Sequence, residues 1–246
     1  MKTANKILLT ALGILFIVII AVFITLRIEL SREAHKGSGH IVTEERSLAG
    51  FTEIEARGNL IIHIEQSDNH NVMIEADDNL IEFVETTVSR GRLRIRLTEP
   101  IRSKSHINLY VQLQDLSRLE GNAGSHFISN EGLHGTVLTK ELGSGARSAL
   151  YLFYDELNVI LKSGSFSNLS GSTNDFSVEV TSGAVIDASR LEALTCKVIS
   201  KSGAEAFVFV SESLTANASS GGLINYHGNP AHKSWNTSGG GQIIQK

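Results

Sequence analysis

The chain has little cysteine. Cys196 is its single cysteine among 246 residues, which excludes a disulfide within the chain and a zinc site built from several cysteines. Nothing around it, between Thr195 and Lys197, marks it as an activated nucleophile. We interpret Cys196 as a small, partly buried structural residue.

Proline is also rare, with two residues against 22 glycines. A disordered linker would contain more proline, and a collagen-like chain would carry a strict glycine period. Many glycines with few prolines are typical of a β-rich domain with tight corners that need a positive φ.

An excess of positive charge is absent as well. From residue 47 onward the chain has 16 Lys and Arg against 22 Asp and Glu, a net charge of −6. A mildly acidic domain argues against nucleic acid as a partner.

Long apolar runs are absent except for one, residues 7–26, which holds no charge over 20 residues. At about 1.5 Å per residue it spans roughly 30 Å, the thickness of a bilayer core. We therefore predict a cytoplasmic tail over 1–6, a transmembrane anchor over 7–26 and a polar tether over 27–48. A cleaved signal peptide is the alternative, although no small-x-small cleavage site follows Thr25. Basic residues on both sides of the run leave its orientation open.

Short alternating runs begin at Phe51 and predict strands over 60–66, 71–76, 93–97 and 107–113. Residues 79–91 could be helix or strand, and their Val and Thr content favours strand. No amphipathic helix of ten or more residues is expected beyond the anchor.

From about residue 121 small-residue corners recur at Gly124, Gly145, Gly164, Gly183, Gly203, Gly221 and Gly239, in steps of 21, 19, 19, 20, 18 and 18 residues. A regular period of this size predicts stacked coils. We therefore expect an all-β, single-stranded β-solenoid (β-helix) with coils of roughly 18–21 residues, in which six steps of about 4.8 Å give a stack of roughly 29 Å. Glycine would turn each corner, and the adjacent Ser or Thr hydroxyls could form a ladder along the stack. Val185 is expected in the core.

The solenoid is expected to occupy residues 49–246, with an irregular, charged part over 49–120 and regular coils over 121–246. The last residues, 241–246, begin one more strand. Gly58, Gly91 and Gly124 lie 33 residues apart, which could mark longer coils in the first part.

Four arginines alternate with other residues: Arg90, Arg92, Arg94 and Arg96. On a strand they would share one face, which could bind anionic lipid headgroups or acidic polysaccharide. We favour a solvated face paired with acids on adjacent strands, for which Glu53, Glu55, Glu65 and Glu75 are candidates.

A catalytic solenoid that cleaves glycosides would need two converging carboxyl groups, about 5–10 Å apart. Acids do occur on successive coils, at Asp155, Glu156, Asp175, Glu179, Asp187, Glu192 and Glu205. Their positions relative to the corners differ, so no aligned pair is expected. The nine histidines are scattered, and the pair His227 and His232 does not fit a metal-ligand pattern. No catalytic residue, cofactor-binding residue or metal ligand is predicted.

The two ends of this region resemble a known family. The C-terminal segment 222–243 resembles the closing signature of the bacterial GIN domain family, described as putative auto-transporter adhesin head domains. The matching residues are Gly222, Ile224, Tyr226, Gly228, Pro230, Ser238 and Gly239. Residues 51–80, with the run at 90–97 after them, resemble the start of that family.

The resemblance covers residues 49–246 and implies an exported bacterial envelope domain with a β-solenoid fold and no catalytic residues to transfer. An exported domain implies a short cytoplasmic tail. No cysteine follows the apolar run, unlike in lipoprotein-type relatives, which favours the inner membrane with the C-terminal domain in the periplasm.

The sequence thus predicts a non-enzymatic, membrane-anchored envelope domain that acts as an adhesin-like module binding proteins or glycans. The alternatives are a carbohydrate-binding or carbohydrate-cleaving solenoid, and an envelope sensor or assembly factor. Export after signal cleavage remains the alternative to inner-membrane anchoring. The expected partners are the membrane, through residues 7–26, and envelope proteins or glycans. The oligomeric state is left open.

Overall fold

A computed structural model describes residues 13–14, 16–23, 34–102 and 107–246 of the chain. It divides the chain into two units, residues 1–35 and 36–246, which are described separately below.

In the first unit, residues 13–14 and 16–23 are helical, and their apolar side chains, such as those of Ile17 and Phe23, are exposed. Within the described residues, no helix combines the length and the apolar character needed to cross a bilayer. Residues 7–12, 15 and 24–26 of the predicted anchor lie outside the described residues, as does the predicted tail over 1–6.

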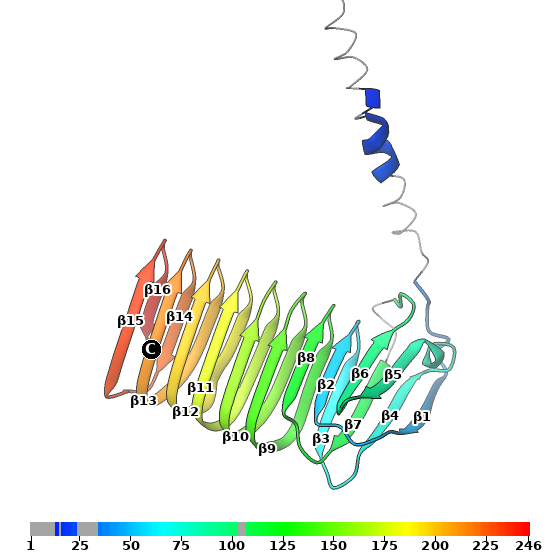
Figure 1. Cartoon of the computed structure of the whole chain (residues 1–246), viewed down its shortest axis with the longest axis horizontal. Helices are drawn as coiled ribbons and strands as arrows, with labels where there is room; N and C mark the ends of the chain where they lie inside the picture. Colours follow the sequence, from blue (N-terminus) through cyan, green and yellow to red (C-terminus); the bar gives the residue numbers. More distant parts are fainter. Residues whose placement is uncertain (1–12, 15, 24–33, 103–106) are drawn as a thin grey trace, which may run out of the picture. The chain divides into compact units, whose positions relative to one another are not determined.

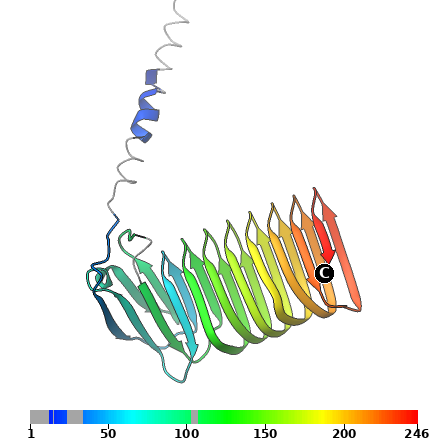
Figure 2. The same cartoon turned by 180° about the vertical axis from the view of Figure 1, so that it is seen from behind.

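The second unit is a β-solenoid, as the sequence predicts. Each regular coil is one long strand that bends halfway and folds back, so that the coils stack into two layers (Figures 1 and 2). Neighbouring coils pair in parallel, for example Leu157 with Phe176 and Phe176 with Cys196. The regular strands are β9 (His126–Leu142), β10 (Arg147–Leu161), β11 (Phe166–Thr181), β12 (Val185–Lys201) and β13 (Glu205–Ser219), followed by β14 (Leu223–His227), β15 (His232–Ser238) and β16 (Gln242–Gln245).

The corners between coils are two-residue turns in which both central residues have positive φ. At the corner after β11, Ser182 has φ 55° and Gly183 has φ 70°, and the N–H of Ala184 donates to the carbonyl of Thr181 at 3.2 Å. Positive φ at both positions with this bond defines a type I′ turn. The prediction that glycine turns each corner with positive φ is confirmed for Gly183.

The ladder along these corners is made by the backbone and not by hydroxyl groups. The N–H of Gly164 donates to the carbonyl of Ser182 at 3.1 Å, and the N–H of Gly183 donates to that of Ser202 at 3.2 Å. The predicted hydroxyl ladder is therefore wrong for these serines. Both turn residues stand at the exposed edge, where the peptide groups of successive coils already satisfy one another.

The last corner is shifted by one residue from the sequence assignment. Its two positive-φ residues are Gly239 and Gly240, and Ser219 pairs with Ser238, so Gly240 is the equivalent of Gly221. The step from Gly221 is therefore 19 residues and not 18.

The core lies between the two layers and is built from inward-facing rows. Ala184 and Ile186 are fully buried, whereas Val185 between them points outward and is half-buried, so its predicted place in the core is wrong. The turn determines which residues of the strand face the core. The small residue after its glycine, Ala184, faces inward, and the side chains alternate from there. Cys196 lies in the core, 3% exposed, and burial raises the pKa of its thiol to about 12. Its structural interpretation is confirmed, and it is more deeply buried than expected.

The first part of the solenoid does not follow chain order. Its strands are β2 (Glu53–Arg57), β3 (Ile61–Gln66), β4 (Asn71–Asp77), β5 (Val84–Ser89), β6 (Arg92–Leu97), β7 (Ile107–Leu113) and β8 (Arg118–Asn122), with a short 3-10 helix η1 (Ile81–Phe83) before β5. One layer has the order β6–β2–β8–β9 and the other the order β7–β3–β9. The β2–β3 coil is thus inserted between β6–β7 and β8–β9.

The 33-residue spacing of glycines does not mark longer coils. Gly91, with Arg90, forms the turn of the antiparallel hairpin β5–β6, whereas Gly58 lies at a coil corner, where its N–H donates to the carbonyl of Asn122. Gly91 and Gly58 therefore have different structural roles.

Antiparallel strands close this end of the solenoid. β5 pairs with β6, β4 pairs with β7, and β1 (Ile41–Ser47) pairs with β4. The predicted tether over 27–48 is therefore wrong for residues 41–47, which form a strand. Their many charged side chains hid the strand pattern in the sequence. The preference for strand over helix in residues 79–91 is confirmed for β5, apart from the turn of 3-10 helix.

Candidate functional site

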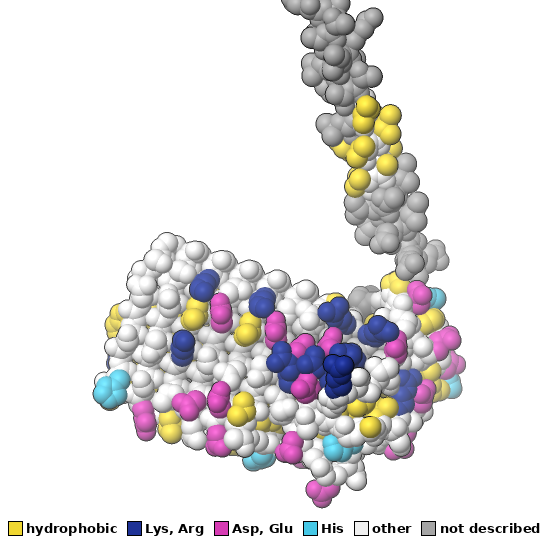
Figure 3. All heavy atoms as spheres, in the orientation of Figure 1, with side chains coloured by type: hydrophobic (Ala, Val, Ile, Leu, Met, Phe, Trp, Pro, Cys, Tyr) yellow, Lys and Arg dark blue, Asp and Glu magenta, His cyan; other side chains and the backbone are white. Residues whose placement is uncertain are grey.

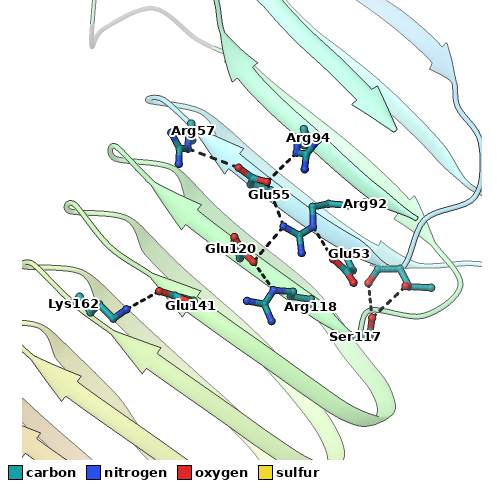
Figure 4. A network of polar contacts seen from close by, with 11 residues as sticks. Glu53, Glu55, Arg57, Arg92, Arg94, Ser117, Arg118, Glu120, Glu141 and Lys162 are labelled. Carbon is teal, nitrogen blue, oxygen red and sulfur yellow. Dashed lines mark hydrogen bonds and ion pairs between the residues drawn. The ribbon is translucent and has the colours of Figure 1, made fainter. Parts of the chain in front are cut away.

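Two of the alternating arginines, Arg92 and Arg94, lie in a charged patch on the outer face of β6, β2 and β8. We use this name for Glu53, Glu55, Arg57, Arg92, Arg94, Arg118 and Glu120, whose positive and negative side chains interleave over these strands (Figures 3 and 4). The parallel register produces this mixture, because Glu53 stands beside Arg92 and Glu55 beside Arg94.

Arg92 is the centre of the charged patch. Its guanidinium lies 2.7 Å from Glu53, 3.6 Å from Glu55 and 3.5 Å from Glu120 (Figure 4). The hydrogen bond that Arg92 donates to Glu53 and the charges of the neighbouring carboxylates raise the pKa of Arg92. Arg94 pairs with Glu55 at 3.1 Å, and Arg118 pairs with Glu120.

The paired-face interpretation is confirmed for Arg92, Arg94 and Arg96, which acids on neighbouring strands neutralise. Arg90 lies in the hairpin turn before β6, so its predicted place on the strand face is wrong. Of the four acids proposed, Glu53 and Glu55 pair with arginine, whereas Glu65 and Glu75 accept hydrogen bonds from Gln112 and Asn108. Sequence reasoning missed Glu120 and Glu85, the second of which pairs with Arg96 at 2.8 Å. A two-residue hairpin turn at Arg90–Gly91 would have predicted that cross-strand pair.

Two carboxylates do align on successive coils, contrary to the sequence expectation. Glu156 and Asp175 are direct partners across the parallel pair β10–β11, each eleven residues after its corner glycine. They line a groove of about 340 Å³ together with hydroxyl and amide side chains. Asn158 donates to Glu156 at 2.6 Å, and the Thr195 hydroxyl donates to Asp175 at 2.6 Å. We call this the β10–β12 groove.

A second groove lies on the other layer, where β3 and β9 diverge. It measures about 270 Å³ and is lined by His63, Ile64, Glu65, Tyr110, Val111, Ile128, Asn130 and Glu131. The rings of His63 and Tyr110 stack at 4.7 Å between centroids, with 12° between their planes. We call this the β3–β9 groove. It combines aromatic surface with carboxylate and amide groups, of which the sequence had pointed only to Glu65, as a partner for arginine.

A buried lysine lies in the core of the first regular coils. Lys140 is 0% exposed, and its Nζ donates to the hydroxyl of Ser167, which lies 3.0 Å from that of Ser148. Burial lowers the pKa of Lys140 to about 7. A neutral lysine beside a serine is a base next to a nucleophile, but Ser167 is also 0% exposed, so no external substrate reaches it. In the described ranges, no group of three or more His, Cys, Asp or Glu side chains is placed to hold a metal ion.

Solved structures of bacterial proteins share this fold. A putative adhesin from Bacteroides fragilis has a TM-score of 0.79 at 19% identity and covers 87% of this chain and 100% of its own. A putative adhesin from Parabacteroides distasonis gives 0.69 at 20% identity, and a putative lipid binding protein from the same species gives 0.68 at 21%, each with 87% of this chain and 100% of its own covered.

No curated protein matches the chain. A family model described as "Putative auto-transporter adhesin, head GIN domain" matches residues 50–230, which include the charged patch and both grooves. The chain therefore belongs to the GIN domain family, as its two ends suggested.

Proposed function

We propose that the protein is a non-enzymatic interaction module of the bacterial cell envelope, of the adhesin-like kind. The observation that carries this proposal is a row of outward polar side chains in register across four coils: Glu156, Asp175, Thr195 and Ser213. Coils repeat at about 4.8 Å, so such rows offer many small contacts to an extended ligand. Membership of a family described as adhesin heads supports the same function.

The proposal includes anchoring through residues 7–26, with the solenoid in the periplasm and the short tail in the cytoplasm. The support is the uncharged apolar run itself, which is long enough for a bilayer. Release after signal cleavage is the alternative. Fractionation of cells that express the tagged full chain separates the two, since an anchored chain stays in the membrane pellet at high salt and at its full mass.

The polar lining of the β10–β12 groove favours glycans or proteins over lipids as partners. This groove is lined by two acids, four hydroxyl side chains and one amide, along with Lys197, Phe176 and Cys196. One structure of similar fold bears the name of a lipid binding protein. An apolar acyl chain would, however, leave the polar groups of this groove without hydrogen-bond partners.

A carbohydrate-cleaving solenoid is the second candidate, and the register of Glu156 with Asp175 is the observation that favours it. Glycosidase carboxylates flank the scissile bond from its two sides. Glu156 and Asp175 stand side by side in one row of one sheet, so both reach a sugar from the same side. This arrangement suits binding better than cleavage.

The test is a pull-down of envelope extracts with the detergent-solubilised full chain, followed by assay of the same glycan fractions for new reducing ends. The proposal predicts saturable capture of a protein or glycan and no new reducing ends. Cleavage that is lost in both Glu156→Gln and Asp175→Asn would establish the enzyme instead. Absence of any saturable capture would refute the interaction module.

A further inference from the structure

The β3–β9 groove forms where the pairing between β3 and β9 ends, after three residues. β3 pairs with β9 over Ile61–His63 and then continues alone beside β7 to Gln66. On its other side, β9 shifts register between Ile128 and Gly132, so that three residues stand opposite Leu150 alone. A bulge of this kind re-aims side chains. Here it sets Asn130 and Glu131 at the groove.

Hydrogen bonds hold the groove open and fixed. The hydroxyl of Ser129 accepts from the N–H of Tyr151 at 2.9 Å, which satisfies a backbone donor that the bulge leaves unpaired. Next to Glu65, the side chain of Gln66 connects the end of β3 to the chain segments on both sides of it. Its amide donates to the carbonyls of Gln114 and His134 at 2.8 and 3.0 Å, and it accepts from the N–H of His134 at 2.8 Å. The protein's own hydrogen bonds therefore fix the walls of the groove.

The lining groups select the chemistry of a ligand. The stacked rings of His63 and Tyr110, with Ile128, offer apolar surface, while Glu65, Glu131 and Asn130 offer hydrogen-bond acceptors. A pyranose ring has both counterparts, an apolar face of C–H groups and a rim of hydroxyl donors. Neither Lys nor Arg lines this groove, and two carboxylates do, so acidic sugars and phosphates are disfavoured.

The size of the groove limits what it holds. Its volume of about 270 Å³ falls just below the roughly 300–1,000 Å³ of pockets for drug-sized ligands, which suits one or two rings of a longer chain. We infer that the β3–β9 groove binds a non-acidic pyranose unit of an envelope glycan. This inference rests on the proposed interaction function and names its ligand class and its site.

The test uses the full chain in detergent on an array of neutral, amino and acidic glycans. The variant is Glu131→Gln combined with Asn130→Ala, both at exposed positions. The matched control is Glu212→Gln combined with Asn236→Ala, also at exposed positions and outside both grooves and the polar row. Thermal unfolding of each variant checks that the fold is kept.

We expect the wild type to bind non-acidic glycans, the β3–β9 variant to bind them at least tenfold more weakly, and the control to match the wild type. Lost hydrogen bonds to a carboxylate have effects of this size. The inference is overturned if no non-acidic glycan binds, if acidic glycans bind best, if the groove variant keeps full affinity, or if calcium chloride titration shows that the groove binds calcium alone.

A separate readout distinguishes this inference from the proposed function. If the groove variant captures envelope material as well as the wild type does, the glycan site is wrong while the interaction function stands. If the wild type captures nothing, the interaction function itself fails.

Discussion

At the scale of single residues, Lys140 is the least expected feature of the core. It occupies a row in which the neighbouring coils place Leu119, Val159 and Val178. Burial lowers its pKa from the ordinary 10.5 to about 7. Between these two values the unfolded chain binds the proton and the folded chain does not, so stability rises with pH across this window. Below pH 7 lysine is charged in both states, and the penalty of burial is complete.

Replacing Lys140 by Met should therefore stabilise the fold at pH 7, by about 2–5 kcal/mol, since each pKa unit corresponds to about 1.4 kcal/mol. Urea denaturation at pH 7 and pH 10 measures the effect. The gain of Lys140→Met over the wild type should shrink toward pH 10. An equal gain at both pH values would show that titration of Lys140 is not its cause.

Ser125 carries a buried hydroxyl group that has no hydrogen-bond partner among the described residues. The same position after the corner is Ala146 in the next coil and Ala184 two coils further. Ser125→Ala should stabilise by about 1 kcal/mol, because an unsatisfied buried hydroxyl is removed.

The matched control is Ser165→Ala at the equivalent position, where the hydroxyl donates to the carbonyl of Leu142 at 3.1 Å. That variant should destabilise. Chemical denaturation of both variants gives the two signs, and a loss of stability in Ser125→Ala would contradict the account.

At the scale of elements, the type I′ corners set the phase of every coil. A Cβ at Gly183 would meet no atom within 4 Å, so the cost of substitution there comes from φ 70° alone. Gly183→Val should destabilise by about 1–3 kcal/mol through this strain. A neutral result in urea denaturation would show that the corner can relax to another turn.

Gly171 provides the contrast within β11. It has φ 114°, and a Cβ there would lie 1.9 Å from the carbonyl oxygen of Leu152 in the preceding coil. Gly171→Ala should therefore lower the free energy of unfolding more than Gly183→Val does. The new Cβ would force the backbones of β10 and β11 apart, in addition to the strain of a positive φ. The same denaturation series ranks the two, and the reverse order would contradict this reading of the two sites.

The regular coils were predictable because their period is local: a small residue, a glycine and a β-branched run recur at nearly constant spacing. The insertion of β2–β3 between later strands was not, because no local pattern encodes a long-range exchange of neighbours. The register of Glu156 with Asp175 could have been read from the corners, since both follow a corner glycine by eleven residues. The burial of Lys140 could not be predicted, because a charged residue in an alternating strand is normally assigned to the exposed face.

At the scale of the whole molecule, residues 36–246 form a unit of their own, in which every strand belongs to one continuous sheet. A chain that lacks residues 1–30 should therefore be soluble and folded. Size-exclusion chromatography and circular dichroism test this, with a single symmetric peak and a β spectrum expected. Aggregation of the shortened chain would contradict a self-contained solenoid.

The central claim is that the solenoid binds envelope material without consuming it. The most direct measurement is a titration of purified envelope fragments with labelled full-length chain, in which bound protein and released sugar are followed together. The account predicts saturable binding with no release of sugar above the background of untreated fragments. Release that grows with time, or binding that never saturates, would contradict it.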